Sequence, residues 1–160
     1  MSNTEQIKAA QEKFSALLTE QFARIEKMKA EKDFVDYSKL DNIIIGVVGG
    51  DGIGPAITEQ AHRILEFLLA DEVEKGKITF NVIDGCTIER RAEVGKALPD
   101  DVVEELKKCH VILKGPTTTP RAGDPWPNIE SANVAMRKEL DLFANVRPVK
   151  VPEQGIDWTF

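Results

Sequence analysis

The sequence predicts an α/β fold in which a mainly parallel sheet is flanked by helices and preceded by a helical extension. Residues 1–40 contain no glycine or proline and repeat apolar side chains at three- and four-residue intervals, which is typical of an amphipathic helix. From residue 41 onwards, β-branched runs alternate with helical patterns, and this alternation favours parallel strands joined by helical crossovers. We therefore expect a helical extension over residues 1–40 and an α/β portion over residues 41–160.

The extension is expected to form one helix from about Thr4 to Lys32. Six large apolar side chains form its stripe: Phe14, Leu17, Leu18, Phe22, Ile25 and Met28. A stripe of this kind is stable only when another surface covers it, and packing on the α/β portion or subunit assembly would do so. Residues 1–40 contain seven basic and seven acidic side chains, whereas a membrane-surface helix or a calmodulin-type target has a basic excess.

The α/β portion begins with a β-branched run, Asn42–Val48, which predicts a fully buried strand. A helix is expected from about Ala56 to Glu74, and Ile78–Ile83 predicts the second strand. The inward side chains of that helix are expected to be Ile57, Ala61, Ile64, Leu65, Leu68 and Leu69.

The remainder alternates in the same way. Helices are expected over Thr87–Glu93, Asp100–Lys108 and Asn133–Leu142, because each combines a helical pattern with a start signal or follows a chain break. Val111–Leu113 predicts a short strand that ends at Lys114. The other segments are a loop, Gly115–Asn128, and an extended run, Phe143–Val151.

Composition excludes several classes of protein. The 160 residues have a net charge of −6 and only 6% aromatic residues, which argues against a general nucleic-acid-binding protein. No apolar run approaches the ~20 residues that span a bilayer, so we expect no membrane partner. The two cysteines, Cys86 and Cys109, have no metal-ligand spacing and favour a reducing, cytoplasmic setting, with Cys86 buried and unreactive.

A glycine-rich loop, Gly49–Pro55, follows the first predicted strand. Ligands of α/β sheets bind outside the carboxyl ends of the strands, so this loop is a candidate binding element. The loop is neither a dinucleotide fingerprint nor a Walker loop, because Pro55 occupies the place of the third glycine in the first and of the lysine in the second. A tight strand-to-helix turn is the alternative interpretation.

The stretch from Lys114 to Lys150 has a local charge of +2 inside an acidic chain. Ser131 and Asn133 flank a predicted helix start, and Arg137 lies one turn after Asn133, so these side chains can share a surface. This arrangement predicts a site for a small, multiply charged anion. In the alternative interpretation, Ser131 only caps the helix and Arg137 is a solvated helix residue. The carboxylates are scattered and predict no metal site.

Two runs go beyond these general patterns. Gly50-Asp51-Gly52-Ile53-Gly54-Pro55 and the stretch Ser131–Pro148, with Lys114–Pro120 between them, resemble the isocitrate/isopropylmalate dehydrogenase family. The resemblance extends in order over about Asn42–Phe160. The Ser-x-Asn-x-x-x-Arg pattern is more similar to isocitrate dehydrogenases, although homoisocitrate or tartrate-type substrates stay open. Ala56 departs from the family, which often has Glu after Gly-Pro.

The resemblance implies a site for isocitrate and for part of NAD or NADP. It implies that Ser131, Asn133, Arg137 and Arg147 bind the substrate carboxylates and that Lys114 approaches the same substrate. It places Thr118 and Thr119 near the nicotinamide. In this family hydride transfer precedes β-decarboxylation, and Mg²⁺ or Mn²⁺ stabilises the enolate. The choice between NAD and NADP stays open.

Family members are more than twice as long as this chain. By resemblance, their metal-binding aspartates, acid–base lysine and adenosine-binding loops have no counterpart here, so we expect no complete catalytic site, no metal ligands, no tightly bound cofactor and no activity of the chain alone. A complementing carboxy-terminal chain would complete the enzyme. The alternatives are a non-catalytic tricarboxylate-binding or regulatory subunit and a truncated remnant. We also expect self-association through an unpaired sheet edge or through residues 1–40.

Overall fold

The computed structural model describes residues 2–30 and 35–149, and the chain divides into two compact units, Met1–Leu40 and Asp41–Phe160. The first unit contains a long helix, α1 (Asn3–Ala30), and a single 3₁₀ turn, η1 (Tyr37–Lys39). Asp36 caps that turn, since its side chain accepts a hydrogen bond from the Ser38 N–H. The predicted start of α1 agrees with the structure within one residue, and its predicted end at Lys32 lies outside the described residues.

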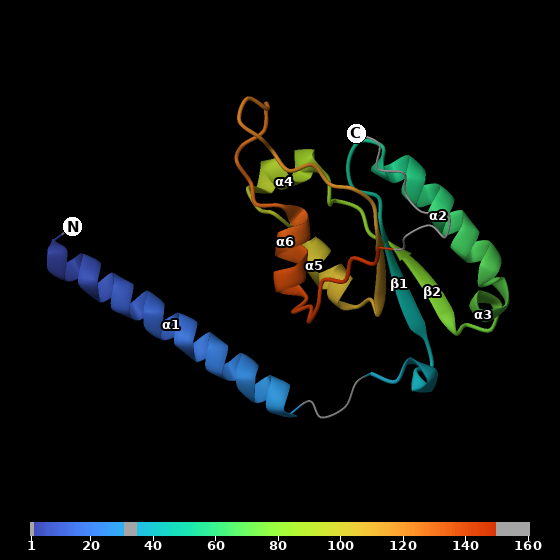
Figure 1. Cartoon of the computed structure of the whole chain (residues 1–160), viewed down its shortest axis with the longest axis horizontal. Helices are drawn as coiled ribbons and strands as arrows, with labels where there is room; N and C mark the ends of the chain where they lie inside the picture. Colours follow the sequence, from blue (N-terminus) through green and yellow to red (C-terminus); the bar gives the residue numbers. More distant parts are fainter. Residues whose placement is uncertain (1, 31–34, 150–160) are drawn as a thin grey trace, which may run out of the picture. The chain divides into compact units, whose positions relative to one another are not determined.

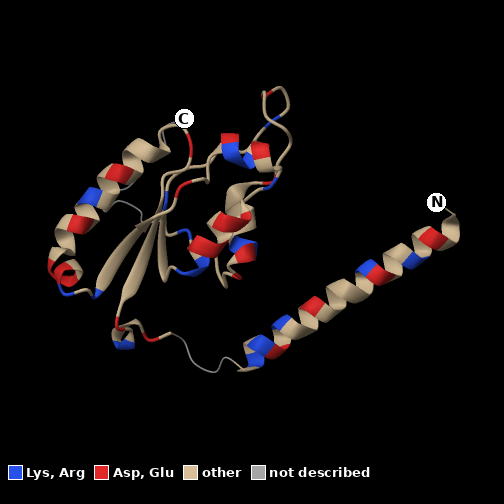
Figure 2. Cartoon of the chain, turned by 180° about the vertical axis from the view of Figure 1, so that it is seen from behind, with Lys and Arg blue, Asp and Glu red and all other residues tan. Residues whose placement is uncertain are grey.

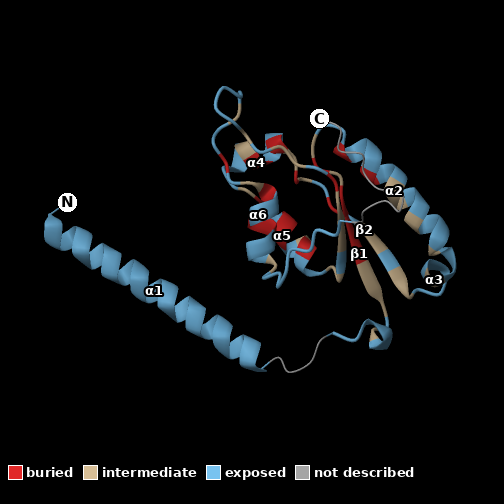
Figure 3. Ribbon diagram, viewed as in Figure 1, coloured by how far each residue is buried: buried red, intermediate tan, exposed pale blue. Residues whose placement is uncertain are grey.

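α1 is solvent-exposed along its described length. It buries none of its residues (Figure 3). The exposed fraction of the stripe side chains ranges from 40% at Leu18 to 64% at Phe22. The stripe side chains are thus exposed in the described chain, and their packing on the α/β portion or in a subunit assembly stays a prediction.

The second unit is built on a three-stranded parallel sheet, which confirms the predicted fold class. Its strands are β1 (Ile43–Val48), β2 (Ile78–Val82) and β3 (Val111–Lys114), in the order β2-β1-β3 (Figure 1). Val47 pairs with Val82, and Val48 pairs with Lys114, so all three strands end at one edge of the sheet. The central strand β1 is buried from Ile45 onwards but only half-buried before it, which corrects the expectation of complete burial.

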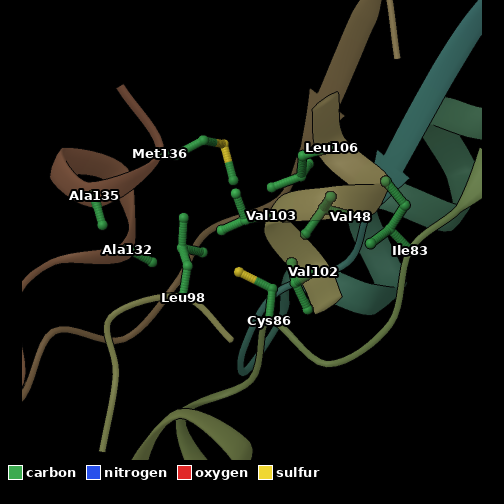
Figure 4. Close-up of a cluster of buried hydrophobic side chains, with 10 residues drawn as sticks. All are labelled: Val48, Ile83, Cys86, Leu98, Val102, Val103, Leu106, Ala132, Ala135 and Met136. Carbon is green, nitrogen blue, oxygen red and sulfur yellow. The ribbon is translucent and has the colours of Figure 1, made fainter. Parts of the chain in front are cut away.

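Helices cover both faces of this sheet. α2 (Gly54–Leu68) and α3 (Ala70–Glu74) lie on one face, and α4 (Ile88–Val94), α5 (Asp100–Lys107) and α6 (Ala132–Glu139) lie on the other (Figure 1). The chain crosses from β1 to β2 on the first face and from β2 back to β3 on the second, which is the doubly wound arrangement that the usual right-handed crossovers produce. The main core lies on the second face (Figure 4) and consists of Val48, Ile83, Cys86, Leu98, Val102, Val103, Leu106, Ala132, Ala135 and Met136.

The helical connection between β1 and β2 differs from the sequence-based expectation in two ways. The expected helix Ala56–Glu74 is divided at Leu69 into α2 and α3. Of its expected inward residues, Ile57, Ile64 and Leu68 are exposed at 48%, 59% and 67%. The reason is that α2 turns a neighbouring face to the sheet, where the His62 ring contacts the Phe80 ring of β2 in a tilted arrangement, with ring centroids 4.6 Å apart.

The last described segment has no regular structure. α6 ends at Glu139, and residues 143–149, predicted to be extended, form neither helix nor strand. Val151, the predicted end of that run, lies outside the described residues.

Cys86 is only 2% exposed, which confirms its predicted burial, and burial raises the pKa of its thiol.

Candidate substrate-binding site

The glycine loop after β1 packs directly on the segment after β3. Gly50 has φ = 75°, and a Cβ at this position would collide with the carbonyl oxygen of Pro116. The next residue, Asp51, donates its backbone N–H to the same oxygen at 2.8 Å. Glycine is therefore required here so that two loops at the carboxyl edge of the sheet can touch.

The Asp51 side chain connects three segments. Its Oδ1 accepts the backbone N–H of Ile88, the first residue of α4, at 2.7 Å. Its Oδ2 accepts the backbone N–H of Thr118 at 2.7 Å. Hydrogen bonds to a carboxylate are stronger than neutral ones, so Asp51 fixes the Thr118 segment against both the glycine loop and α4.

Arg91 of α4 fixes the same segment from another direction. Its side chain is fully buried, and its guanidinium donates to three backbone carbonyls: Ala97 at 2.8 Å, Thr118 at 2.8 Å and Glu130 at 3.0 Å. These bonds offset part of the cost of burying the charge. Because one guanidinium reaches both Thr118 and Glu130, the predicted cofactor loop lies beside the start of α6.

Neither Asp51 nor Arg91 is among the predicted site residues. Asp51 lies in a loop that the sequence does single out, and its place between glycines is a usable signal. Arg91 has no such signal, because its three acceptors lie 6, 27 and 39 residues away in the chain.

Ser131 occupies the N-cap position of α6, but its side chain makes no capping hydrogen bond within the described chain. Asn133 and Arg137 follow it on α6, and both are exposed. They lie one helical turn apart, so their side chains can reach one ligand. The surface at the start of α6 thus has a hydroxyl, an amide and a guanidinium near the N-terminal end of a helix, where backbone N–H groups favour anions.

Lys114 and Thr118 are half-buried, whereas Thr119 is exposed. Lys114 ends β3, and its Nζ donates to the Gly115 carbonyl at 2.9 Å and to Thr117 Oγ1 at 3.0 Å. Burial is the main cause that lowers the pKa of Lys114. The lysine is therefore held within the loop at the carboxyl edge of the sheet.

Arg147 is not connected to this group. It is exposed in the irregular segment after α6, and within the described residues no hydrogen bond or ion pair joins it to α6. The structure thus brings Thr118 beside Glu130 and Ser131, and it places Asn133 and Arg137 on the adjoining helix.

Two concave regions elsewhere have the wrong charge for a polycarboxylate. A cavity of about 310 Å³ at the carboxyl ends of β1 and β2 has Glu59 and Asp84 in its wall. A depression of about 480 Å³ between α5 and α6 combines two lysines with four carboxylates: Asp100, Glu104, Glu130 and Glu139. Like charge would repel a polycarboxylate from both of these regions. A third depression, of about 390 Å³, has one cation and one carboxylate in its wall, Arg121 and Asp124.

The described residues also contain no group of three His, Cys, Asp or Glu side chains that could hold a metal ion. They therefore do not fit the Mg²⁺ or Mn²⁺ site that the resemblance implies for the complete enzyme. Thr118 and Thr119, the residues predicted to contact a nicotinamide, lie in the loop after β3. None of the helices in the described ranges is both long and apolar enough to cross a membrane.

The fold and the site define an α/β protein whose loops meet at the carboxyl edge of a parallel sheet. The family model for isocitrate/isopropylmalate dehydrogenase matches residues 44–158. The chain belongs to this family, which confirms the resemblance found in the sequence.

Several relatives align with the same region. An isocitrate dehydrogenase (NADP) of Caldococcus noboribetus is 41% identical over 129 residues, covering 74% of this chain and 28% of that protein. The isocitrate dehydrogenase (NADP) of Archaeoglobus fulgidus is 42% identical over 109 residues, or 68% of this chain and 25% of the relative. A 3-isopropylmalate dehydrogenase 1 of Bradyrhizobium diazoefficiens is 34% identical over 119 residues, with coverages of 68% and 28%. The chain thus spans about a quarter of the length of these relatives.

Proposed function

We propose that this chain provides the substrate-anchoring amino-terminal part of an isocitrate dehydrogenase-like enzyme, which oxidatively decarboxylates isocitrate to 2-oxoglutarate when complete. Ser131, Asn133, Arg137 and Arg147 bind the carboxylates of isocitrate, and Lys114 supplies a further positive charge. Thr118 and Thr119 contact the nicotinamide end of NAD or NADP. The names of two relatives, which specify isocitrate and NADP, support this choice of substrate and cofactor.

One observation is the main support for this proposal. Arg91 binds the carbonyls of both Thr118 and Glu130, so the loop proposed for the cofactor adjoins the helix start proposed for the substrate. Hydride transfer requires the nicotinamide and the substrate carbon to be neighbours, and this juxtaposition meets that requirement. The Ser131 hydroxyl makes no capping hydrogen bond to α6 in the described part of the chain, so it is available as a hydrogen-bond donor to a carboxylate.

The chain alone is inactive in this proposal, because the metal that stabilises the enolate has no ligand set among the described residues. The metal ligands and the acid–base lysine come from the carboxy-terminal part of the fold. A complementing chain is therefore a proposed partner, and self-association through the sheet edge or α1 is another. The two free cysteines support a cytoplasmic location in this proposal.

The substrate site is tested by titrating the purified chain with isocitrate in a calorimeter. Binding is expected in the wild type, and Arg137→Gln is expected to weaken it about tenfold or more, because a charge-assisted hydrogen bond contributes about 1.5–3 kcal/mol. Arg63→Gln is the matched control, since it removes the same charge from α2, on the other face of the sheet. Equal affinities of the two variants would overturn the assignment of Arg137.

Activity is tested separately, with isocitrate, Mg²⁺ and NAD or NADP. We expect no reduced cofactor from the chain alone and measurable turnover after addition of a carboxy-terminal segment from a relative. Isocitrate binding without turnover in that mixture would instead favour a regulatory subunit. Turnover by the chain alone would overturn the proposed incompleteness, and loss of solubility with a dye-binding, loosely packed state would favour a truncated remnant.

A further inference from the structure

α1 has an apolar pattern that is more regular than the stripe first suggests. Seven positions follow each other at alternating intervals of four and three residues along the helix: Ile7, Gln11, Phe14, Leu18, Gln21, Ile25 and Met28. This is the heptad spacing of a coiled coil, in which such positions form the seam between helices. All seven side chains belong to exposed residues. The opposite side of the helix has alanine at every seventh residue: Ala9, Ala16, Ala23 and Ala30.

Six of the seven seam residues are arranged symmetrically about Ala16, and the seventh, Met28, lies opposite Thr4 in such a pair. In an antiparallel pair centred there, Ile7 lies opposite Ile25, Gln11 opposite Gln21, and Phe14 opposite Leu18 of the second copy. Apolar residues thus meet apolar residues, and the two glutamines meet each other. A polar residue at a seam position specifies register, because any shift would bury its amide against an apolar side chain. The same symmetry makes the surface self-complementary, as a two-fold dimer requires.

The charges favour the antiparallel orientation. In this alignment Glu5 lies within one turn of Lys29 of the second copy, and Glu26 lies within one turn of Lys8. A parallel pair in register would instead bring Arg24 towards Lys29, two like charges. Antiparallel helix dipoles also attract each other. Both signs of charge alternate along α1 (Figure 2). Glu26 and Lys29 pair with each other at 2.8 Å in the single chain, and their side chains are 71% and 68% exposed, so charged groups of a second helix can reach them.

We propose that α1 is a dimerisation helix, which pairs antiparallel with α1 of a second copy of this chain. The proposal deepens the self-association suggested above and does not depend on isocitrate binding. A second copy explains both the pairing of the glutamines and the charge pattern. The large side chains Leu17 and Phe22 flank the seam and widen the buried surface; they are 51% and 64% exposed in the single chain.

Sedimentation equilibrium of the full chain tests the assembly. The expected mass is twice the 17.8 kDa of the chain. Leu18→Glu is expected to shift the mass to that of one chain, because it places a charge in the seam. Ala16→Glu, two residues away on the outer side, is the matched control and is expected to stay dimeric. Glu is a good helix former, so circular dichroism should find α1 helical in both variants.

A second experiment tests the orientation. Ile7→Cys and Ile25→Cys are made separately in a Cys109→Ala background, with the buried Cys86 left in place. Oxidation should yield a covalent dimer after the two variants are mixed and little from either alone. A wild type with the mass of one chain, a Leu18→Glu variant that stays dimeric, or cross-linking of each variant with itself but not in the mixture would overturn the proposal. Isocitrate titration is unaffected by these outcomes, so the proposed function is judged independently.

Discussion

The Asp51 carboxylate and the Arg91 guanidinium bind the two backbone groups of one residue, Thr118. Asp51 accepts the Thr118 N–H at 2.7 Å, and Arg91 donates to the Thr118 carbonyl at 2.8 Å. Each side chain also binds a second element: Asp51 binds the start of α4, and Arg91 binds Glu130 just before α6. The position of the candidate site is thus fixed by two charged side chains that need not contact the substrate.

Replacing Arg91 should therefore destabilise the α/β unit strongly. Arg91→Met leaves three backbone carbonyls without their donor, and a buried acceptor without a partner costs about 1–3 kcal/mol. We expect the free energy of unfolding to fall by about 3 kcal/mol or more, measured by urea denaturation. Arg90→Met is the matched control, because Arg90 is exposed and its ion pair with Asp101 is of the surface kind that contributes about 0–1 kcal/mol.

A second variant that keeps the charge makes the prediction testable even if Arg91→Met does not fold. Arg91→Lys retains a cation but has a single donor group, which cannot reach three carbonyls in different directions. Its destabilisation should lie between those of Arg90→Met and Arg91→Met. If Arg91→Met and Arg90→Met had the same unfolding free energy, the three hydrogen bonds from Arg91 to backbone carbonyls would not contribute to stability.

Asp51→Asn should also destabilise the protein, by about 1.5–3 kcal/mol, because the amide nitrogen replaces one of two accepting oxygens and the lost bonds involve a charge. Asp84→Asn, which changes an exposed aspartate after β2, is the control.

The double variant Asp51→Asn/Arg91→Lys should show a coupling free energy of about 0.5 kcal/mol or more in thermal denaturation, because both side chains bind Thr118. If the destabilisations of the two single variants simply added up in the double variant, Asp51 and Arg91 would not act together on Thr118.

The parallel sheet could be predicted because its signals are local. The β-branched runs and the helical patterns between them lie within short windows, and the crossover rule then determines the sheet. The anion-binding surface could be expected for the same reason, since Ser131, Asn133 and Arg137 lie within one helical turn and its cap. The roles of these residues came only from the family resemblance.

Other features depend on contacts between distant segments. Arg91 resembles any charged helix residue until residues 97, 118 and 130 are brought around it. The inward face of the first crossover was predicted only in half: Ala61, Leu65 and Leu69 are half-buried, whereas Ile57, Ile64 and Leu68 are exposed. The apolar side chains form two neighbouring faces, and the one beside His62, which contacts Phe80, meets the sheet. Periodicity identifies an apolar stripe, as in α1, but it does not identify the surface that covers it.

The stability of the fold should depend on pH through Lys114. Burial lowers the pKa of Lys114 in the folded chain below the ordinary lysine value of 10.5. Between these two pKa values the unfolded chain binds more protons than the folded chain, so this lysine makes the unfolding free energy rise with pH in that window. The Cys86 thiol acts in the opposite direction above its ordinary value of 9.0, because burial raises its pKa.

The Lys114→Met variant removes the lysine and also raises the pKa of the Cys86 thiol, because the Lys114 charge lowers it in the wild type. Both changes stabilise the wild type relative to the variant as the pH rises. Urea denaturation from neutral pH to pH 10.5 should show the wild type gaining stability relative to Lys114→Met as the pH rises towards the ordinary lysine value. A difference that stays constant over this range would mean that Lys114 titrates like an exposed lysine.

Ser131 and Thr87 occupy the same position at the start of two helices, and their hydroxyls should have different functions. The Thr87 side chain caps α4 by accepting the Arg90 N–H at 3.5 Å, so Thr87→Ala should cost about 1 kcal/mol of stability. The Ser131 hydroxyl makes no capping bond within the described chain, so Ser131→Ala should change stability by less than about 0.5 kcal/mol.

In isocitrate titrations the variant with the larger effect should be Ser131→Ala: it should lose about tenfold in affinity, and Thr87→Ala should bind like the wild type. A Ser131→Ala variant that is as unstable as Thr87→Ala but binds isocitrate normally would show that this hydroxyl stabilises the helix and does not anchor the substrate.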